Sequence, residues 1–162
     1  TVWELVALGR QPYTNWIGQL TEKDQQAIEQ AIRATELTPI QNQKHFTLSD
    51  GQLQKALIAR ALAQETPLIV LDEPTTHLDL VHKLKLIQLL KSICATQDKC
   101  VLFSTHDIEL ALSSCDQLIV MTPEQVRQDT PKNLLASCIF SQLFSDQRII
   151  FDPITKKFSF TI

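Results

Sequence analysis

The sequence is poor in glycine, with only Gly9, Gly18 and Gly51 among its 162 residues. A phosphate-binding P-loop needs Gly-x-x-x-x-Gly-Lys-Ser/Thr, because the backbone N–H groups of that turn cradle the phosphates. No two glycines here have that spacing, and no Gly-Lys pair occurs. The scarcity of glycine therefore excludes a P-loop within these residues, and with it the usual grip on a nucleoside triphosphate.

Other absences narrow the class of protein further. No CxxC pair occurs, which argues against a zinc site or a disulfide framework and favours reduced thiols at Cys94, Cys100, Cys115 and Cys138. No apolar run approaches the roughly 20 residues that a membrane span needs, and no signal peptide is recognisable. The net charge of −3 excludes the basic footprint of a nucleic-acid-binding domain. With 44% apolar residues, the chain can build one domain with a hydrophobic core.

An uninterrupted apolar run, Leu68–Leu71, is typical of a strand that is covered on both faces in a parallel sheet. Asp72 and Glu73 follow it directly, so we expect both carboxylates at the edge where open α/β sheets bind ligands. Neighbouring strand residues point to opposite sides. One acid can therefore hold a hydrated Mg²⁺ while the other faces an attacking water. The alternative is a strand that simply ends at a charged turn.

A polar turn, Leu48–Gln52, comes just before a helix with an apolar face. The free N–H groups and the positive dipole at a helix N-terminus form a site for anions. A plain helix cap by Ser49 is the alternative interpretation of the same residues. On the far side of the apolar run, Asp79 is expected to cap the next helix.

A second apolar run, Cys100–Ser104, predicts another buried strand, and His106 follows it closely. Strands that run in parallel end at the same edge of the sheet, so we expect His106 to reach the edge that carries Asp72 and Glu73. An imidazole there can hydrogen-bond a γ-phosphate. A structural role is the alternative for a lone histidine after a strand.

Together these motifs resemble those of ABC-type ATPases. Leu48–Gln52 resembles the signature motif, usually Leu-Ser-Gly-Gly-Gln, and Ile69–Glu73 resembles the Walker B strand with its catalytic glutamate. Thr76–Asp79 resembles the D-loop, and His106 occupies the place of the switch histidine. The resemblance covers nearly the whole chain.

The resemblance implies a fold and a way of working. The fold is α/β: a partial P-loop NTPase-like parallel sheet flanked by helices, with an α-helical signature subdomain. It implies a helical subdomain over 1–66, and the C-terminal part of the catalytic core, with a terminal helix and β-hairpin, over 67–162. It also implies ATP and Mg²⁺ as cofactors, and a second ATPase subunit paired head to tail so that two ATP molecules lie between them.

The resemblance also assigns roles to residues of this sequence. Glu73 would polarise the attacking water and His106 would sense the γ-phosphate, which makes them the catalytic candidates. Asp72 would organise the Mg²⁺ and is the metal candidate. The candidates for binding the nucleotide of the other subunit, or for the dimer interface, are Ser49, Gly51, Gln52 and Asp79. His82 lacks a metal-ligand constellation and is interpreted as a surface residue.

Asp50 departs from the signature pattern, in which glycine is usual. A carboxylate suits a helix N-terminus but not a nearby triphosphate, because two unit charges ~5 Å apart at an effective dielectric of ~20 repel by roughly 3 kcal/mol. We therefore expect the Asp50 side chain to point away from the phosphate.

The phrase Val-Ala-Leu-Gly-Arg-x-Pro-Tyr over Val6–Tyr13 resembles the helical subdomain of ATPases that drive iron-siderophore, haem and cobalamin importers. That resemblance implies transmembrane permease subunits as partners and a peripheral position on the cytoplasmic face of the inner (plasma) membrane. Three aromatic residues fit either contacts with that partner or a local core: Trp3, Tyr13 and Trp16.

Two other functions remain open. One is a non-catalytic binding or regulatory module on the same fold. The other is a soluble ABC ATPase of DNA repair or translation, against which Val6–Tyr13 and the lack of basic patches argue; nucleic acid is therefore not an expected partner. Without a P-loop, the chain is expected to be part of a longer ATPase, or else a naturally degenerate protein, and to hydrolyse no ATP alone.

The remaining segments predict structure without chemistry. Thr1–Leu8 is expected to be a short helix that Gly9 caps, and Thr21 with Asp24 to form a capping box. Pro131–Phe144 is expected to be one helix. The tail from 148 to 160 is expected to form a β-hairpin.

Overall fold

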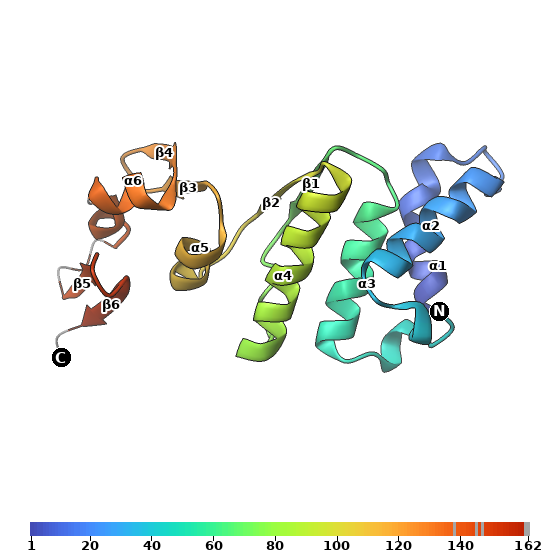
Figure 1. Ribbon diagram of the computed structural model, residues 1–162, viewed down its shortest axis with the longest axis horizontal. Coiled ribbons are helices and arrows are strands. Elements are labelled where there is room, and N and C mark those ends of the chain that lie inside the picture. The colour runs from blue at the N-terminus through green and yellow to red at the C-terminus, as the bar shows by residue number, and fades with distance from the viewer. Residues whose placement is uncertain (138, 145, 147, 161–162) are drawn as a thin grey trace. The chain divides into compact units, whose positions relative to one another are not determined.

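The computed structural model in Figure 1 describes residues 1–137, 139–144, 146 and 148–160, so Cys138 lies outside the described residues. The contacts of the chain divide it into two compact units, Thr1–Ser104 and Thr105–Ile162, which are described separately. The predicted boundary between 66 and 67 separates parts by function rather than by contacts, and it stays a prediction.

The first unit begins with three helices that pack on one another: α1 (Val2–Ala7), α2 (Glu22–Ala34) and α3 (Asp50–Leu62). Short 3-10 turns lie between them: η1 (Leu8–Tyr13), η2 (Thr38–Ile40) and η3 (His45–Thr47). The predicted first helix and the capping box at the start of α2 are confirmed. Fully buried aliphatic side chains from all three helices form their common core: Val2, Val6, Ile28, Ile32 and Ile58.

From the sequence we expected Gly9 to cap α1, but the C-cap is Leu8. Gly9 lies buried inside η1, where the chain passes against the backbone of α3. A Cβ atom at position 9 would lie only 2.2 Å from the carbonyl oxygen of Arg60. Glycine is needed here because only a residue without a side chain allows this close approach of two backbones.

Arg10, the next residue, is only 3% exposed and ties the three helices together. Its guanidinium donates hydrogen bonds to the carboxylate of Asp24 in α2, to the carbonyl oxygen of Ala63 and to the carboxylate of Glu65. Each of these bonds is 2.8 Å long. The central carbon of the guanidinium lies 4.1 Å from the centre of the Tyr13 ring. A buried charge is costly unless it is paired, and these contacts pair it completely.

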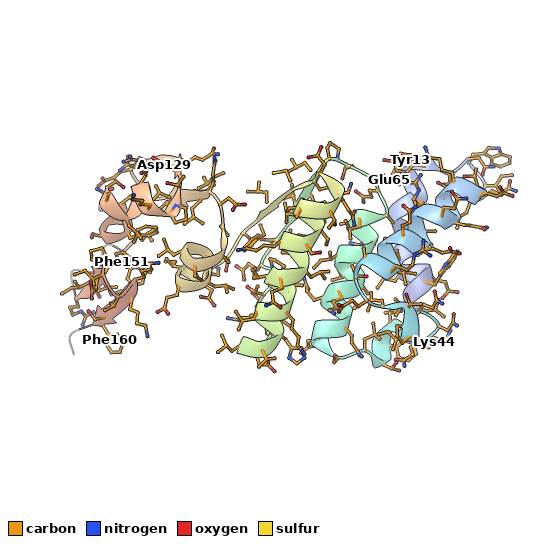
Figure 2. All side chains as sticks on the ribbon, in the orientation of Figure 1. Tyr13, Lys44, Glu65, Asp129, Phe151 and Phe160 are labelled. Atoms are coloured by element: carbon orange, nitrogen blue, oxygen red, sulfur yellow. The ribbon has the colours of Figure 1, made fainter. Side chains whose placement is uncertain are left out.

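The aromatic residues of this region differ in their surroundings. The hydroxyl of Tyr13 (Figure 2) donates to the carbonyl oxygen of Gln64, so this side chain belongs to the local structure around Arg10. Trp16, by contrast, is 95% exposed. Of the two roles predicted for the aromatics, local packing therefore fits Tyr13, and contact with a partner stays a prediction for Trp16.

The sheet of the first unit is a parallel pair joined by a helix. β1 (Leu68–Leu71) and β2 (Cys100–Phe103) pair in register, with Leu68 opposite Cys100 and Leu71 opposite Phe103. α4 (Leu80–Gln97) makes the crossover. A strand, a crossover helix and a parallel strand form the building block of α/β folds, so the predicted fold class is confirmed.

The expectation that both faces of this sheet are covered is wrong. Ile69 is only 3% exposed, whereas Val70, which points to the opposite face, is 66% exposed. Leu102, opposite Val70, is exposed as well. The apolar run was read correctly as a strand, but coverage depends on neighbouring segments that a single strand does not reveal.

The second unit contains small antiparallel pairs and short helices. α5 (Ile108–Ser114) leads into β3 (Leu118–Met121), which pairs with β4 (Val126–Asp129). After α6 (Pro131–Ala136) and η4 (Ile139–Gln142), the tail forms the hairpin of β5 (Ile149–Asp152) and β6 (Lys157–Phe160). The hairpin at the end of the chain was predicted, and it is confirmed.

One expectation for this unit needs correction, and one strand was not predicted. The single helix expected over Pro131–Phe144 ends at Ala136 and is followed by η4. The polar segment after β3 contains the strand β4 although it lacks glycine, because Thr122 closes the turn instead. Its backbone N–H and its hydroxyl both donate to the carbonyl oxygen of Gln125.

Phenylalanine side chains fill the core of the second unit. The ring centres of Phe140 and Phe151 are 5.0 Å apart, and those of Phe151 and Phe158 are 4.8 Å apart. Among the described cysteines, Cys100 carries an exposed free thiol. Among the helices of the described residues, none is long and apolar enough to cross a membrane.

Replacing Gly9 by alanine is expected to destabilise the chain by about 1–3 kcal/mol, the usual cost of forcing an extra carbon into a packed site. The cause is the clash with the Arg60 carbonyl. Urea denaturation followed by circular dichroism measures the change. A Gly9→Ala variant as stable as the wild type would show that the two backbones do not approach so closely.

The Asp24 carboxylate predicts a specific acid sensitivity. Hydrogen bonds from the hydroxyl and the backbone N–H of Thr21, followed by that from Arg10, lower the pKa of Asp24 from 3.8 to about 2. A depressed pKa stabilises the fold while the group is ionised. The melting temperature of the wild type should therefore exceed that of Asp24→Asn most above pH 3.8, and the difference should shrink as the pH falls toward 2.

The matched control for this measurement is Asp98→Asn at the exposed end of α4, where asparagine also tolerates the left-handed backbone. Its difference from the wild type should not change over the same pH range. A melting-temperature difference between the wild type and Asp24→Asn that stays constant with pH would contradict the lowered pKa of Asp24.

Candidate functional site

The two predicted acids lie directly after β1, where the chain turns sharply. Glu73 has a φ of 44°, and His77 in the same loop has a φ of 67°, so both adopt the left-handed conformation that residues other than glycine rarely take. The Glu73 carboxylate accepts a hydrogen bond of 2.9 Å from the Thr76 hydroxyl. Such strained residues persist where the surrounding structure holds them, and they are common at functional sites.

Ser104, at the end of β2, connects both acids to the sheet. Its hydroxyl donates a hydrogen bond of 2.6 Å to the Asp72 carboxylate and accepts one of 2.9 Å from the backbone N–H of Glu73. Its own backbone N–H donates to the carbonyl oxygen of Leu71, which continues the parallel pairing. The sequence analysis missed this residue. Its signal was a polar side chain as the last residue of a predicted strand, at the edge where the acids were expected.

The site has the donors that magnesium prefers. The Asp72 carboxylate is exposed and lies against a hydroxyl, and Mg²⁺ is usually held by one or two carboxylates together with phosphate oxygens. Within the part of the chain that the structure describes, no group of three or more His, Cys, Asp or Glu side chains could hold a metal ion by itself. The donor set thus fits a Mg²⁺ that arrives with a nucleotide.

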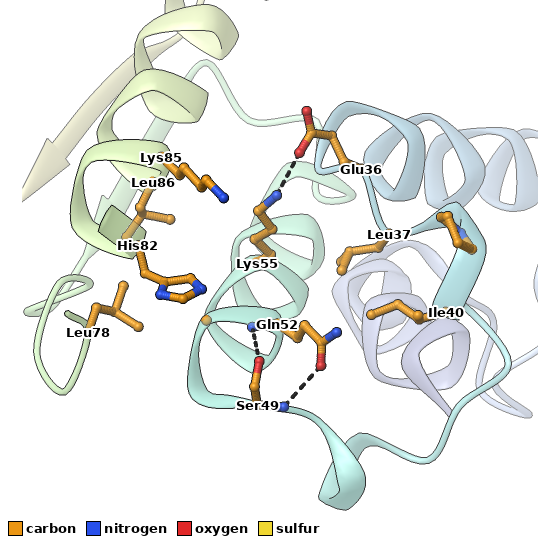
Figure 3. A pocket seen from close by; sticks show the side chains of 12 residues that line it. Glu36, Leu37, Ile40, Ser49, Gln52, Lys55, Leu78, His82, Lys85 and Leu86 are labelled. Carbon is orange, nitrogen blue, oxygen red and sulfur yellow. Dashed lines mark hydrogen bonds and ion pairs between the residues drawn. The ribbon is translucent and has the colours of Figure 1, made fainter. Parts of the chain in front are cut away.

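The predicted signature turn forms the start of α3 (Figure 3). The Ser49 hydroxyl accepts from the backbone N–H of Gln52 over 3.3 Å, and the Gln52 side chain accepts from the backbone N–H of Ser49 over 3.0 Å. This reciprocal pair is a capping box, so Ser49 is a helix cap. Asp50 is exposed in the first turn of the helix.

Asp79 caps α4, as predicted. Its carboxylate accepts from the backbone N–H of His82 over 2.8 Å, and both of its oxygens lie 2.9 Å from the imidazole Nδ1. These hydrogen bonds, the backbone one first, lower the pKa of Asp79. His82 is exposed, as expected for a surface residue, but its ring is held in place.

The signature turn and the Asp79 turn line one pocket of about 300 Å³ (Figure 3). Its lining includes Ser49, Gly51 and Gln52 from α3, and His82 from α4. The structure thus brings the predicted nucleotide-facing residues of α3 close to the turn that Asp79 begins.

The predicted residues therefore form two groups in the first unit: Asp72 with Glu73, joined by Ser104, and the signature residues with Asp79, joined by His82. His106 is the second residue of the second unit and lies just before α5. Its expected convergence with the acids stays a prediction.

Known proteins with similar sequences are ATP-binding proteins of ABC transporters. Residues 1–76 match the family model described as ABC transporter. The chain is 36% identical over 146 residues to the probable siderophore transport system ATP-binding protein YusV of Bacillus subtilis, covering 90% of this chain and 53% of that protein. It is 36% identical over 159 residues to the iron(3+)-hydroxamate import ATP-binding protein FhuC of the same species, covering 97% and 59%.

Solved structures agree with these relatives. An inward-facing metal-chelate type ABC transporter matches with a TM-score of 0.81 and 29% identity, over 88% of this chain and 58% of that one. The dimeric post-hydrolysis state of the ATP-binding cassette MJ0796 with ADP and Pi matches with a TM-score of 0.62 and 31% identity, over 81% and 56%. The chain spans little more than half the length of these proteins. It belongs to the family of ABC transporter ATP-binding proteins.

Proposed function

We propose that this chain is part of the ATP-hydrolysing subunit of an ABC importer for iron-siderophore, haem or cobalamin compounds. The observation that carries the proposal is the pair of acids at the end of β1, which Ser104 fixes to the neighbouring parallel strand. Acids held at the carboxyl edge of a parallel sheet are placed for a nucleotide and its metal ion.

The roles of the residues follow from their chemistry. Asp72 would hold Mg²⁺ through its exposed carboxylate, and the bound ion would supply positive charge to neutralise the phosphates. Glu73 accepts a proton from, or orients, the attacking water. His106 contacts the γ-phosphate. The free N–H groups at the start of α3, with the Ser49 hydroxyl and the close approach allowed by Gly51, face the triphosphate held by a second subunit.

The partners in this proposal are a second ATPase subunit, paired head to tail, and the transmembrane permease subunits. The dimeric structure of MJ0796 supports the first, and the similarity to YusV, a probable siderophore transport system ATP-binding protein, supports the second. In our proposal the protein lies on the cytoplasmic face of the inner membrane, where these partners would meet. Closing of the dimer on ATP and opening after hydrolysis would move the permease.

A regulatory module without catalysis is the second candidate. It is favoured by the lack of a P-loop among these residues, since the chain by itself offers no cradle for the phosphates. The two candidates differ in what the parent protein does: the importer subunit hydrolyses ATP, and the regulatory module does not.

The first test is ATP turnover. The 162-residue chain alone should hydrolyse no measurable ATP, whereas the parent protein expressed from its own gene should do so with Mg²⁺. Glu73→Gln should lower that turnover by about 10²–10⁴-fold, the usual contribution of a general base. Turnover by the chain alone that Glu73→Gln abolishes would contradict its predicted inactivity, and a parent without turnover would favour the regulatory module.

Co-purification with a polytopic membrane protein, rather than with nucleic acid, separates the importer from a DNA-repair or translation ATPase.

The second test separates the two roles of Ser49. Ser49→Ala should destabilise the chain by about 0.5–2 kcal/mol through loss of the helix cap, as measured by urea denaturation. Ser49→Asp keeps a cap, so it should retain stability. In the parent protein, however, Ser49→Asp should lower ATP turnover by repelling the phosphate. Full turnover with Ser49→Asp would leave Ser49 as a helix cap only.

A further inference from the structure

His82 makes two contacts that tie separate parts of the first unit together. It projects from α4 toward the start of α3 (Figure 3). On one side its Nδ1 lies 2.9 Å from both carboxylate oxygens of Asp79. On the other side its ring covers Gly51, where an added Cβ would lie 3.1 Å from the ring carbon Cδ2 and 3.9 Å from Nε2.

The contact with Asp79 fixes the orientation of the ring. An ionised carboxylate can only accept hydrogen bonds, so Nδ1 carries the proton and donates it. The lowered pKa of Asp79 means that this carboxylate is ionised at neutral pH. The backbone N–H of His82 donates to the same carboxylate, so the side chain and the backbone of one residue are anchored to one acid.

The contact with Gly51 leaves little room for a side chain at this position while the His82 ring stays in place. A distance of 3.1 Å between a Cβ and a ring carbon is shorter than an ordinary van der Waals contact. The ring therefore lies directly on the backbone of the first turn of α3, one residue after Asp50 and two after the capping Ser49. A movement of the ring changes the position of this turn.

We propose that His82 is a positioning residue that holds the Gly51 turn of α3 against the Asp79 turn of α4, so that the two turns move together. This inference rests on the proposed function, in which both turns face the nucleotide and the second subunit. A change at the Asp79 turn, such as contact with that subunit, would then reach Ser49 within the same chain. His82 itself would not need to touch the nucleotide.

The test uses amide NMR spectra of the full 162-residue chain without nucleotide. Asp79→Ser keeps a helix cap for α4 but removes the carboxylate that holds the His82 ring. We expect this change to shift the Gly51 amide cross-peak. Asp107→Ser, which alters the capping carboxylate of α5 in the other unit, is the matched control and should leave Gly51 unchanged.

Two variants of His82 separate its two contacts. His82→Phe keeps a ring for Gly51 but cannot donate to Asp79, and His82→Asn keeps a donor for Asp79 but has no ring to cover Gly51. In either background, Asp79→Ser should no longer shift the Gly51 cross-peak. An unchanged Gly51 cross-peak in the wild-type background, or an equal shift in all three backgrounds, would overturn the proposal.

A second measurement covers the case in which a variant at Asp79 unfolds. Gly51→Ala should lower the denaturation midpoint of the wild-type chain, because the new methyl group meets the ring. In the His82→Ala background the same substitution should not lower it, since alanine favours a helix over glycine. An equal loss in both backgrounds would show that His82 does not press on Gly51.

These measurements need no ATP, so their result is independent of turnover. If Asp79→Ser does not shift the Gly51 cross-peak while the parent protein hydrolyses ATP, the proposed function stands and only the role of His82 is lost. If Asp79→Ser does shift that cross-peak through His82 while the parent shows no turnover, the proposed function fails and the contact between the two turns remains.

Discussion

The buried guanidinium of Arg10 is the interaction on which the first unit depends. Its partners come from distant parts of the chain: Asp24 begins α2, while Ala63 and Glu65 follow α3. Without a positive charge between them, a buried carboxylate and a buried carbonyl oxygen would lose the hydrogen bonds that Arg10 donates, and unpaired buried polar groups are costly in a protein interior. Gly9 makes this arrangement possible, because it lets the Arg10 backbone lie against α3. The orientation of α3, and therefore of the signature turn at its other end, follows from this contact.

The chemical groups of the site are arranged on the same principle of mutual restraint. The acids at residues 72 and 73 do not simply project from a strand; a hydroxyl from the neighbouring strand holds one by its carboxylate and the other by its backbone. The signature turn is fixed by its own capping box and by the ring of His82. Groups that are held in place before a ligand arrives lose less freedom when it binds, which is a condition for efficient catalysis.

Sequence reasoning succeeded where a signal lies within one element. The apolar runs predicted β1 and β2, their parallel pairing followed from the fold class, and the capping residues predicted the starts of α2 and α4. It failed where the answer depends on what lies opposite. Nothing in the spacing of His82 reveals that its ring faces Gly51, and nothing in the run Leu68–Leu71 reveals that one face is open. The strand β4 was not predicted, because its turn contains no glycine and is closed by a threonine hydroxyl instead.

The open face of the parallel pair has a practical consequence. Leu68 and Val70 from β1 lie opposite Cys100 and Leu102 from β2, and all four are exposed. Among the described residues no third strand extends this sheet, so unpaired strand edges border an apolar surface, a combination that promotes aggregation. A researcher who produces this polypeptide by itself should plan for dilute solutions, a reductant to protect the exposed thiol, and a solubilising fusion partner.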